Sequence, residues 1–309
     1  MPNARADRVS LGILLMVAFT ITAPFLDSFA KLATDTVPIG QIVAARFVVQ
    51  AVLLLPLAAF LGWLHRPTAR EVGLHFARAS LILLSTFLIV RAFAEMPIAD
   101  AVAIFFVEPF LLTLAGAFFL GETLGIRRVL ACGVGFLGTL LVIQPNFANS
   151  GWVALLPLGT AACFTAYLLL TRRMATAMHP VSLQAYTALA ASALILPVLT
   201  GFEGTGQDLL DPVWPTWTDG LLLLGVGVAG GIAHLFLSFA FSHAPAATLA
   251  PLQYLEILFA TLLGFLIFAD LPNPTAFTGM LLITGSGVYI WWRERKLERL
   301  AEIPPAALP

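Results

Sequence analysis

The sequence predicts an all-α integral membrane protein of ten transmembrane helices, arranged as two inverted repeats of five helices. Three observations lead to this fold class: the composition, the recurrence of long apolar runs, and a similarity between the two halves of the chain. Of the 309 residues, 60% are hydrophobic and 11% are charged, and the mean hydropathy is +0.94. A soluble domain carries about 25% charged residues, so the composition excludes a water-soluble fold.

Long apolar runs recur from residue 11 to residue 292, each close to the roughly 20 residues that a helix needs to cross a bilayer. Proline, glycine and charged residues separate the runs. The first run is long and lacks a convincing small-residue cleavage site, so we expect a retained span rather than a signal peptide. The ten predicted spans are 11–30, 39–63, 74–93, 97–120, 127–144, 151–171, 181–200, 218–241, 246–268 and 274–292.

The positive charges predict the orientation. If the N-terminus is cytoplasmic, thirteen of the sixteen Lys and Arg residues fall on the cytoplasmic side, as the positive-inside rule requires. The long connection from Gly201 to Asp219 carries acidic residues and no basic one. We expect a multi-pass protein of the bacterial cytoplasmic (inner) membrane with both termini in the cytoplasm. The thirteen are Arg5, Arg8, Arg66, Arg70, Arg78, Arg127, Arg128, Arg172, Arg173, Arg293, Arg295, Lys296 and Arg299.

The two halves of the chain share a pattern. FAEMPIADAVAIFFVEPFLLTLAGAFFLGE, from Phe93, aligns with FSHAPAATLAPLQYLEILFATLLGFLIFAD, from Phe241, at a constant offset of 148 residues. Each half holds five predicted spans, an odd number, so the second half enters the membrane from the opposite side. The matched residues include Pro97 with Pro245, Glu108 with Glu256, Thr113 with Thr261, and Gly116 with Gly264.

The alignment predicts three regions: a first five-helix repeat over 1–145, a second, inverted repeat over 146–293, and a cytoplasmic tail over 294–309. Charge supports the inversion, because Arg127 and Arg128 follow the first copy of the motif and no basic residue follows the second before the next span. Inverted repeats are typical of secondary transporters, which bind substrate near the midplane at the repeat interface.

Ten spans in two repeats, with EPFLLTLAGAFFLGE closing the fourth span and LEILFATLLGFLIFAD in the ninth, resemble the drug/metabolite transporter superfamily in its EamA-type branch. The resemblance covers about residues 10 to 293, and within the branch the chain is similar to aromatic amino acid exporters of the YddG type. It implies a basket-like bundle with a central cavity that opens alternately to either side of the membrane. It also implies export of amino acids or related metabolites.

We therefore expect a secondary active or facilitative transporter that exports amino acids, aromatic ones included, by alternating access. The alternatives are an importer of a vitamin- or nucleoside-like metabolite, a membrane-embedded enzyme, and a non-transporting membrane partner subunit. No nucleophile and base pattern indicates an enzyme, and no phosphate-binding loop indicates direct use of ATP. The expected partners are a small amino acid-like substrate and the lipid bilayer, with no nucleic acid, cofactor or metal, and we expect a monomer.

Two matches to G-x-G-x-x-G, in GVGFLG from Gly133 and in GVGVAG from Gly225, lie inside apolar spans. A dinucleotide site needs a preceding strand and a βαβ unit. The glycines instead predict close helix packing. Both cysteines, Cys132 and Cys163, also lie in apolar runs, which favours a small hydrophobic role over a disulfide or metal site.

Glu108 and Glu256 stand near the middle of their spans. A charge at the centre of a span costs about 2.5 to 3.5 kcal/mol on insertion scales, so each carboxyl group requires an explanation. Two roles are open for both residues. Each could be a hydrogen-bond partner between helices at the repeat interface, or it could titrate during transport or contact the amino group of a substrate.

Three further charges lie within or beside predicted spans. Arg46 and Arg91 could neutralise the buried carboxyl groups, hold a substrate carboxylate through two hydrogen bonds, or reach the membrane surface along their apolar stems. Asp27 precedes Lys31 by four residues, which predicts a local ion pair on one helix face.

An apolar wall with a few polar groups suits a small amphipathic solute. Pro24 interrupts the first span and predicts a hinge or bend that frames the cavity. Phe106 and Gln253 are additional candidates for contact with the substrate, beside the predicted set that follows. The predicted substrate-binding residues are His75, Phe105, Glu108, Tyr167, His234, Phe239, Tyr254 and Glu256.

Overall fold

A computed structural model describes residues 6–95, 98–121, 125–143, 151–268 and 274–302, and these residues form helices and connecting turns without a strand. Apolar segments fold as helices in lipid because a helix satisfies its backbone hydrogen bonds internally. The elements are α1 (Ala6–Ala33), α2 (Ile39–Phe60), α3 (Ala69–Glu95), α4 (Ile98–Phe105), α5 (Glu108–Leu120), α6 (Ile126–Ile143), η2 (Gly151–Ala154), α7 (Leu155–Ala175), α8 (Pro180–Phe202), α9 (Trp217–His243), α10 (Ala246–Leu249), η3 (Ala250–Tyr254), α11 (Leu255–Phe268) and α12 (Pro274–Glu302).

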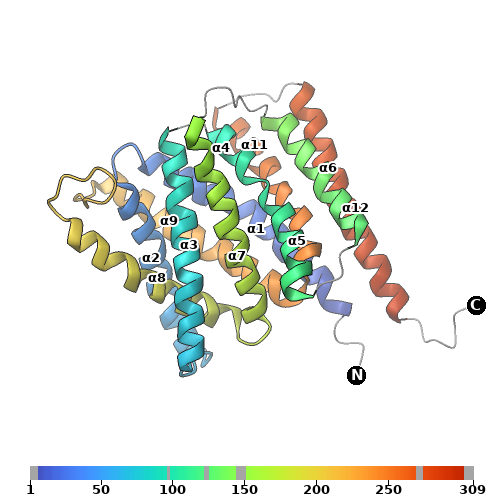
Figure 1. The fold of residues 1–309 in the computed structure, drawn as a ribbon, viewed down its shortest axis with the longest axis horizontal. Helices are drawn as coiled ribbons and strands as arrows, with labels where there is room; N and C mark the ends of the chain where they lie inside the picture. Colours follow the sequence, from blue (N-terminus) through green and yellow to red (C-terminus); the bar gives the residue numbers. More distant parts are fainter. Residues whose placement is uncertain (1–5, 96–97, 122–124, 144–150, 269–273, 303–309) are drawn as a thin grey trace, which may run out of the picture.

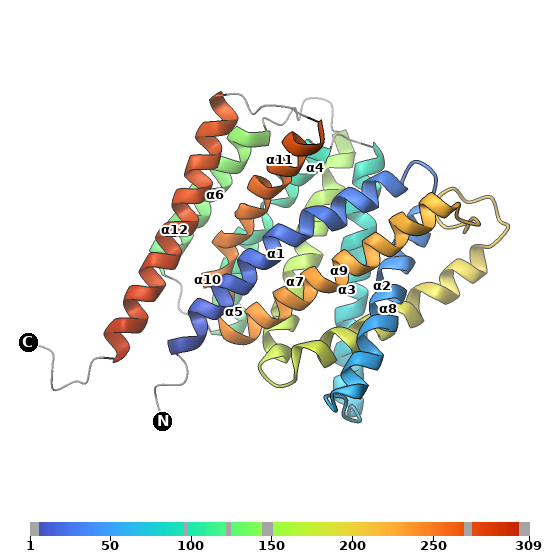
Figure 2. The same ribbon diagram turned by 180° about the vertical axis from the view of Figure 1, so that it is seen from behind.

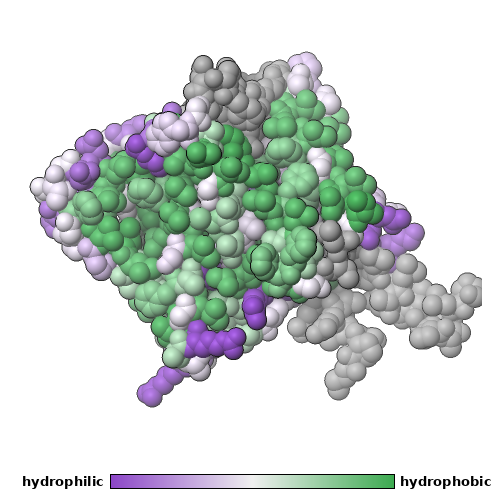
Figure 3. Space-filling model, in the orientation of Figure 1, coloured by the Kyte–Doolittle hydropathy of each residue, from purple (hydrophilic) through white to green (hydrophobic). Residues whose placement is uncertain are grey.

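Six of the described helical segments are long and apolar enough to cross a membrane, and three shorter apolar helical segments accompany them. Large hydrophobic side chains such as Phe60 and Phe118 are exposed on the outside of the bundle. Figure 3 shows a broad hydrophobic face with hydrophilic residues gathered at its edges. This arrangement is that of a multi-pass membrane protein, whose apolar surface faces lipid rather than water. The six long segments are Val9–Ala33, Ile39–Phe60, Ala69–Glu95, Gly151–Ala175, Pro180–Phe202 and Trp217–His243.

The fourth predicted span is not one continuous helix. It divides into α4 and α5, with a turn at Phe106 and Val107 directly before Glu108. Pro109 explains the break, because proline lacks the backbone N–H that would bond to the carbonyl of Phe105 and its ring clashes with that carbonyl.

The ninth predicted span divides at the matching place. It consists of α10, the 3-10 helix η3 and α11, and Pro251 lies within η3. The two breaks also contact each other: the hydroxyl of Tyr254 donates to the backbone carbonyl of Phe106 at 3.1 Å. These two residues are 148 positions apart, the offset of the internal repeat, so equivalent parts of the two halves meet.

The main packing pairs of the bundle follow the internal repeat. α1 packs along α9, α3 along α7, α2 along α8, and α6 along α12. Exchanging the two halves, so that α1 takes the place of α7 and α3 that of α9, maps these pairs onto themselves. In both views α6 and α12 form one edge of the bundle, and α2 and α8 lie towards the opposite edge (Figures 1 and 2).

Glycines let some of these helices approach closely, as expected from the two G-x-G-x-x-G stretches. A Cβ atom on Gly138 of α6 would meet the backbone oxygen of Gly279 of α12, and one on Gly227 of α9 would meet the side chain of Val49 of α2. Small residues allow this close backbone contact. Both glycine-rich stretches therefore lie at helix interfaces.

The first turn of α1 and the last turn of α12 lie at the same end of the molecule (Figures 1 and 2). The connection between α1 and α2 approaches the long connection between α8 and α9. Gly40 N–H donates to the Leu209 carbonyl at 2.8 Å, and the Gln41 side chain exchanges two hydrogen bonds of 2.9 Å with the backbone of Val213. We use the term loop end for the part of the molecule that carries these two connections.

Candidate functional site

A pocket lies in the interior of the bundle, between helices of both halves of the chain. Five phenylalanines form much of its wall, and they come from α1, α3, α4, the turn after α4, and α7: Phe19, Phe93, Phe105, Phe106 and Phe164. A few charged and polar side chains complete it: Asp27, Arg46, His234, Gln253 and Glu256. An apolar wall with convergent polar groups is the usual composition of a small-molecule site.

The pocket is narrow in this conformation. Its volume is about 90 Å³, and a second space of about 30 Å³ that shares Asp27 and Arg46 with it extends from the same wall. Each water molecule in liquid occupies about 30 Å³, and sites for drug-sized ligands have about 300 to 1,000 Å³. In this conformation the pocket is therefore smaller than a site for a drug-sized ligand.

Arg46 of α2 reaches two other helices from the pocket wall. It is 5% exposed, and its Nη1 donates to the hydroxyl of Thr86 on α3 at 2.6 Å. Its Nη2 lies 2.5 Å from Nε2 of His234 on α9, while its Nε has no hydrogen-bond partner among the described residues. A buried guanidinium without a bonded carboxylate has given up hydration that neutral partners only partly replace.

His234 continues into a polar network beneath the pocket. Its Nδ1 lies 3.0 Å from the hydroxyl oxygen of Tyr167 on α7, and Nη2 of Arg78 on α3 donates to the same oxygen at 2.8 Å. The Arg78 guanidinium also stands 4.5 Å from the centre of the Tyr167 ring. The network therefore joins α2, α3, α7 and α9, and it connects the two halves of the chain.

Arg78 is fully buried and makes the largest number of contacts in this network. Besides Tyr167, it donates to the hydroxyl of Thr171 at 2.9 Å, to the carbonyl of Leu183 at 3.3 Å and to the hydroxyl of Thr187. The positive-inside count placed Arg78 on the cytoplasmic side, which stays a prediction, whereas the structure buries its side chain in the interior of the bundle. The residue lies four positions inside the predicted span 74–93, which was the signal that it could face the interior.

Gln184 of α8 was not predicted as a site residue. Its Nε2 donates to the backbone carbonyl of His234 at 2.8 Å and to the hydroxyl of Ser238 at 2.6 Å, and it lies 3.3 Å from the hydroxyl oxygen of Tyr167. Its Oε1 accepts from Gln50 of α2 at 3.3 Å. A polar residue inside the predicted span 181–200 was the available signal.

Glu108 lies behind the pocket rather than in its wall. It is fully buried at the start of α5, and neither carboxyl oxygen has a hydrogen-bond partner among the described residues. Nε2 of Gln253, whose side chain lines the pocket, is likewise buried without a close hydrogen bond, but the Gln253 side chain lies near enough to the Glu108 carboxyl group to interact with it. Both open roles of Glu108 remain hypotheses, and its counterpart Glu256 lines the pocket.

The structure brings together only part of the predicted set. Asp27, Arg46, Phe105, His234 and Glu256 line one pocket. Tyr167, Glu108 and Tyr254 are buried outside its lining. The other predicted residues lie elsewhere: His75 packs against the Tyr186 ring, Phe239 against the His179 ring, and Pro24 lies within the continuous helix α1.

The structure gives different results for the ion pairing of Asp27 and of Arg91. The predicted ion pair between Asp27 and Lys31 was wrong, since no such pair occurs among the described residues: Asp27 faces the pocket and Lys31 is exposed. Arg91 instead forms an ion pair with Glu95, one turn further along α3. Arg91 therefore has a local partner and does not line the interior pocket.

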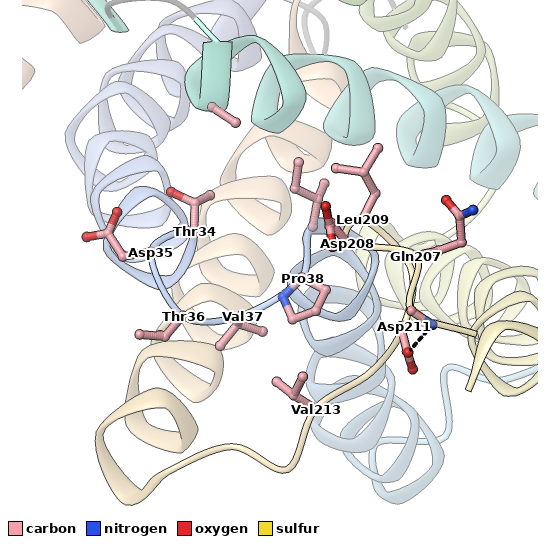
Figure 4. A pocket seen from close by; sticks show the side chains of 13 residues that line it. Thr34, Asp35, Thr36, Val37, Pro38, Gln207, Asp208, Leu209, Asp211 and Val213 are labelled. Atoms are coloured by element: carbon pink, nitrogen blue, oxygen red, sulfur yellow. Dashed lines mark hydrogen bonds between the residues drawn. The ribbon is translucent and has the colours of Figure 1, made fainter. Parts of the chain in front are cut away.

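A wider pocket of about 410 Å³ lies at the loop end. Figure 4 shows it between the connection that carries Thr34 to Pro38 and the connection that carries Gln207 to Val213. Both oxygens of the Asp211 carboxylate are already engaged within the loop. They accept hydrogen bonds from the backbone N–H groups of Gly204 and Gly206 at 2.8 Å each. We therefore assign the interior pocket, and not this one, as the candidate site.

Comparisons with known proteins agree with this architecture. The model of the EamA-like transporter family matches the chain twice, over residues 10–144 and 151–292. A crystal structure of another protein has a TM-score of 0.75 with this chain at 21% identity and covers 94% of this chain and 99% of its own, which shows a shared fold.

Three curated relatives carry transporter names. The chain is 29% identical to a riboflavin transporter of Rhizobium johnstonii over 73% of this chain and 72% of that protein. It is 26% identical to the pseudopaline exporter CntI of Pseudomonas aeruginosa over 90% and 94%. It is 22% identical to an S-adenosylmethionine uptake transporter of Rickettsia bellii over 95% and 98%.

Proposed function

The chain belongs to the EamA-like transporter family, and from that premise we propose that it moves amino acids or related small metabolites across the cytoplasmic membrane by alternating access. Its family and the names of its relatives indicate a small-metabolite transporter rather than an enzyme. We propose a basket of ten spanning helices around a central cavity, with both termini in the cytoplasm and a monomer as the working unit.

The residues that line the interior pocket are the main support for this proposal. Aromatic side chains offer flat surfaces for a ring, and Arg46, Asp27 and Glu256 offer charges of both signs at the same wall. The pocket is built from both halves of the chain, so a relative movement of the halves would change its width and the side to which it opens. A pocket of about 90 Å³ corresponds to a narrow stage of such a cycle.

Two classes of compound are candidates for the transported cargo. Amino acids, aromatic ones included, suit a pocket with both charges and rings, and we propose their export as the first candidate. A vitamin- or nucleoside-like metabolite is the second candidate, because relatives are named for riboflavin and for uptake of S-adenosylmethionine. The relatives are named for uptake as well as for export, so both directions belong in the test.

The test is flux through proteoliposomes that contain only this protein. Labelled phenylalanine, tryptophan, threonine, riboflavin and S-adenosylmethionine are measured in both directions, with and without a pH gradient. We expect saturable flux of at least one compound above empty liposomes, and stimulation by the gradient would indicate proton coupling. Flux by the purified chain would also eliminate the hypothesis of a non-transporting partner subunit.

Phe164→Ala supplies the link to the pocket, since Phe164 lines it and stacks on the Tyr167 ring with centroids 5.6 Å apart. Loss of a stacked ring should weaken cargo binding by about 1 kcal/mol, which is roughly fivefold in affinity. Phe118→Ala is the matched control, because Phe118 is 82% exposed. Absence of flux for the whole panel, or equal flux in Phe164→Ala and wild type, would contradict the proposal.

A further inference from the structure

The polar chain Arg46–His234–Tyr167–Arg78 begins and ends at an arginine. A guanidinium can only donate hydrogen bonds, so both ends of this chain supply hydrogens. Between them stand two groups that each hold one hydrogen: a neutral imidazole and a phenol. Three contacts join the four residues, at 2.5, 3.0 and 2.8 Å.

These contacts cannot use every hydrogen. Arg46 donates to Nε2 of His234, so the imidazole hydrogen lies on Nδ1 and is donated to the Tyr167 oxygen. Arg78 donates to that oxygen as well, and the remaining neighbour, Nε2 of Gln184, is also a donor. The hydroxyl hydrogen of Tyr167 is left without an acceptor among the described residues. A buried donor in that position costs about 1 to 3 kcal/mol.

The count does not depend on how hydrogens are assigned to the histidine. If the imidazole hydrogen is placed on Nε2, the hydroxyl of Tyr167 can donate to Nδ1, but Nε2–H then faces the Arg46 donor at 2.5 Å. A protonated imidazole adds another hydrogen and makes the excess larger. The polar chain of four residues is therefore short of at least one hydrogen-bond acceptor in every protonation state that keeps the phenol intact.

The point at which an acceptor can enter is beside Arg46. Arg46 lines the pocket, and its Nε is buried without a partner among the described residues. His234, whose Nε2 contacts Arg46, lines the same pocket. An anionic group placed there would reach Arg46 and His234 together, whereas Arg78 and Tyr167 lie outside the pocket lining.

We propose that the pocket binds the carboxylate of its cargo between Arg46 and Nε2 of His234. The carboxylate accepts from both residues, His234 then carries its hydrogen on Nε2, and its Nδ1 accepts the hydroxyl hydrogen of Tyr167. Arg78 still donates to the Tyr167 oxygen, so the imidazole hydrogen of His234 and the hydroxyl hydrogen of Tyr167 are both paired. Tyr167 and Arg78 act as positioning residues in this arrangement, since they touch His234 or its partner and not the cargo.

The other charges that face the site select the class of anion. Asp27 of α1 and Glu256 of α11 line the same pocket, and Thr86 and Gln184 add only neutral groups around Arg46 and His234. A phosphate with nearly two negative charges is disfavoured beside two carboxyl groups, whereas one carboxylate can be accommodated. An ammonium group on the same cargo would face Asp27 and Glu256. This inference deepens the proposed function, because it narrows the cargo to carboxylates, amino acid-like ones first.

The first test uses the wild-type protein in detergent and compares acids with their neutral amides. The probes are indole-3-acetate with indole-3-acetamide, and tryptophan with tryptophanamide, each titrated while thermal unfolding is followed. A charge-assisted pair with arginine should make each acid bind at least about tenfold more tightly than its amide. Equal binding of acid and amide, or no binding of either acid, would overturn the carboxylate site.

Variants then test whether the preference for acids over amides depends on Arg46. Arg46→Gln should abolish the difference between acid and amide, and Arg46→Lys should keep part of it, because an ammonium retains the charge but not the planar fork. Arg91→Gln is the control, since Arg91 pairs with Glu95 on α3 and lies outside the pocket lining. An undiminished preference in Arg46→Gln would remove Arg46 from the site.

The two proposals fail separately. Acid-selective binding that depends on Arg46, in a protein that shows no flux, would support the carboxylate site and contradict the transport function. Flux of a compound without a carboxylate, unaffected by Arg46→Gln, would support the transport function and contradict the carboxylate site.

Discussion

Arg46 and Arg78 lie in the interior on neighbouring helices, and each is held by neutral groups: hydroxyls, a carbonyl and an imidazole. Neutral acceptors replace hydration less completely than a carboxylate does. Arg78 compensates with four acceptors and contact with the Tyr167 ring. Arg46 has fewer partners and faces the pocket, so the structural role falls mainly on Arg78 and the binding role on Arg46.

Arg78→Ala should therefore lower the stability of the folded protein by about 3 kcal/mol, since it leaves buried hydroxyl and carbonyl groups without their donor. Thermal unfolding in detergent measures this loss. Arg173→Ala is the control at an exposed arginine of α7 and should stay within about 0.5 kcal/mol of wild type. A similar unfolding temperature for Arg78→Ala and Arg173→Ala would show that the network contributes little to stability.

Glu256→Gln should reduce flux by about tenfold, the size of one lost charge-assisted interaction, without preventing membrane insertion. The reason is its place in the pocket wall, where it can titrate or contact a cationic group. Glu203→Gln, on the exposed connection after α8, should transport as wild type does. Wild-type flux in the purified Glu256→Gln protein would refute a titrating role.

The helices differ in how closely they must pack. α6 and α12 form an edge pair in which Gly138 and Gly279 bring two backbones together (Figure 1). The helix breaks before Glu108 and Leu255 are a second property of individual elements. They leave backbone carbonyl groups available that would accept intrahelical hydrogen bonds in a continuous helix. One of these carbonyls, that of Phe106, accepts the Tyr254 hydroxyl.

Gly279→Leu should separate α6 from α12 and cost about 1 to 3 kcal/mol, as overpacking of a tight contact usually does. Gly285→Leu is the matched control on the same helix, since a Cβ atom at Gly285 meets no atom within 4 Å. The comparison is made by thermal unfolding and by the yield of monodisperse protein. Equal behaviour of the two variants would contradict a close α6–α12 interface.

For the molecule as a whole, the charge distribution predicts that the connection before α3 faces the cytoplasm and the loop end faces away from it. Thr205→Cys and Arg66→Cys place single thiols on exposed positions of these two sides, in a background with Cys132→Ala and Cys163→Ala. In intact cells, a membrane-impermeant maleimide should label Thr205→Cys and leave Arg66→Cys unlabelled until the membrane is permeabilised. The opposite pattern would reverse the orientation and, with it, the side to which each pocket opens.

Hydropathy and charge determined the membrane class, the approximate helix boundaries and the internal repeat, because each depends on transfer energies or side chains that can be counted along the chain. Prolines also stand at the starts of two helices, Pro38 directly before α2 and Pro180 as the first residue of α8. The breaks within the fourth and ninth spans were missed, although Pro109 and Pro251 stood in the sequence, because an apolar run looks the same whether its helix is continuous or not.

Only the tertiary structure decided which polar residues meet. Arg46 and His234 are 188 residues apart and Arg78 and Tyr167 are 89 apart, and their contacts depend on how each helix is rotated against its neighbours. Rotation follows from packing between many side chains, including the glycine contacts, and no local pattern expresses it. For that reason the sequence identified Arg46 and His234 as candidates separately, whereas the structure made them, with Tyr167 and Arg78, one network beside the pocket.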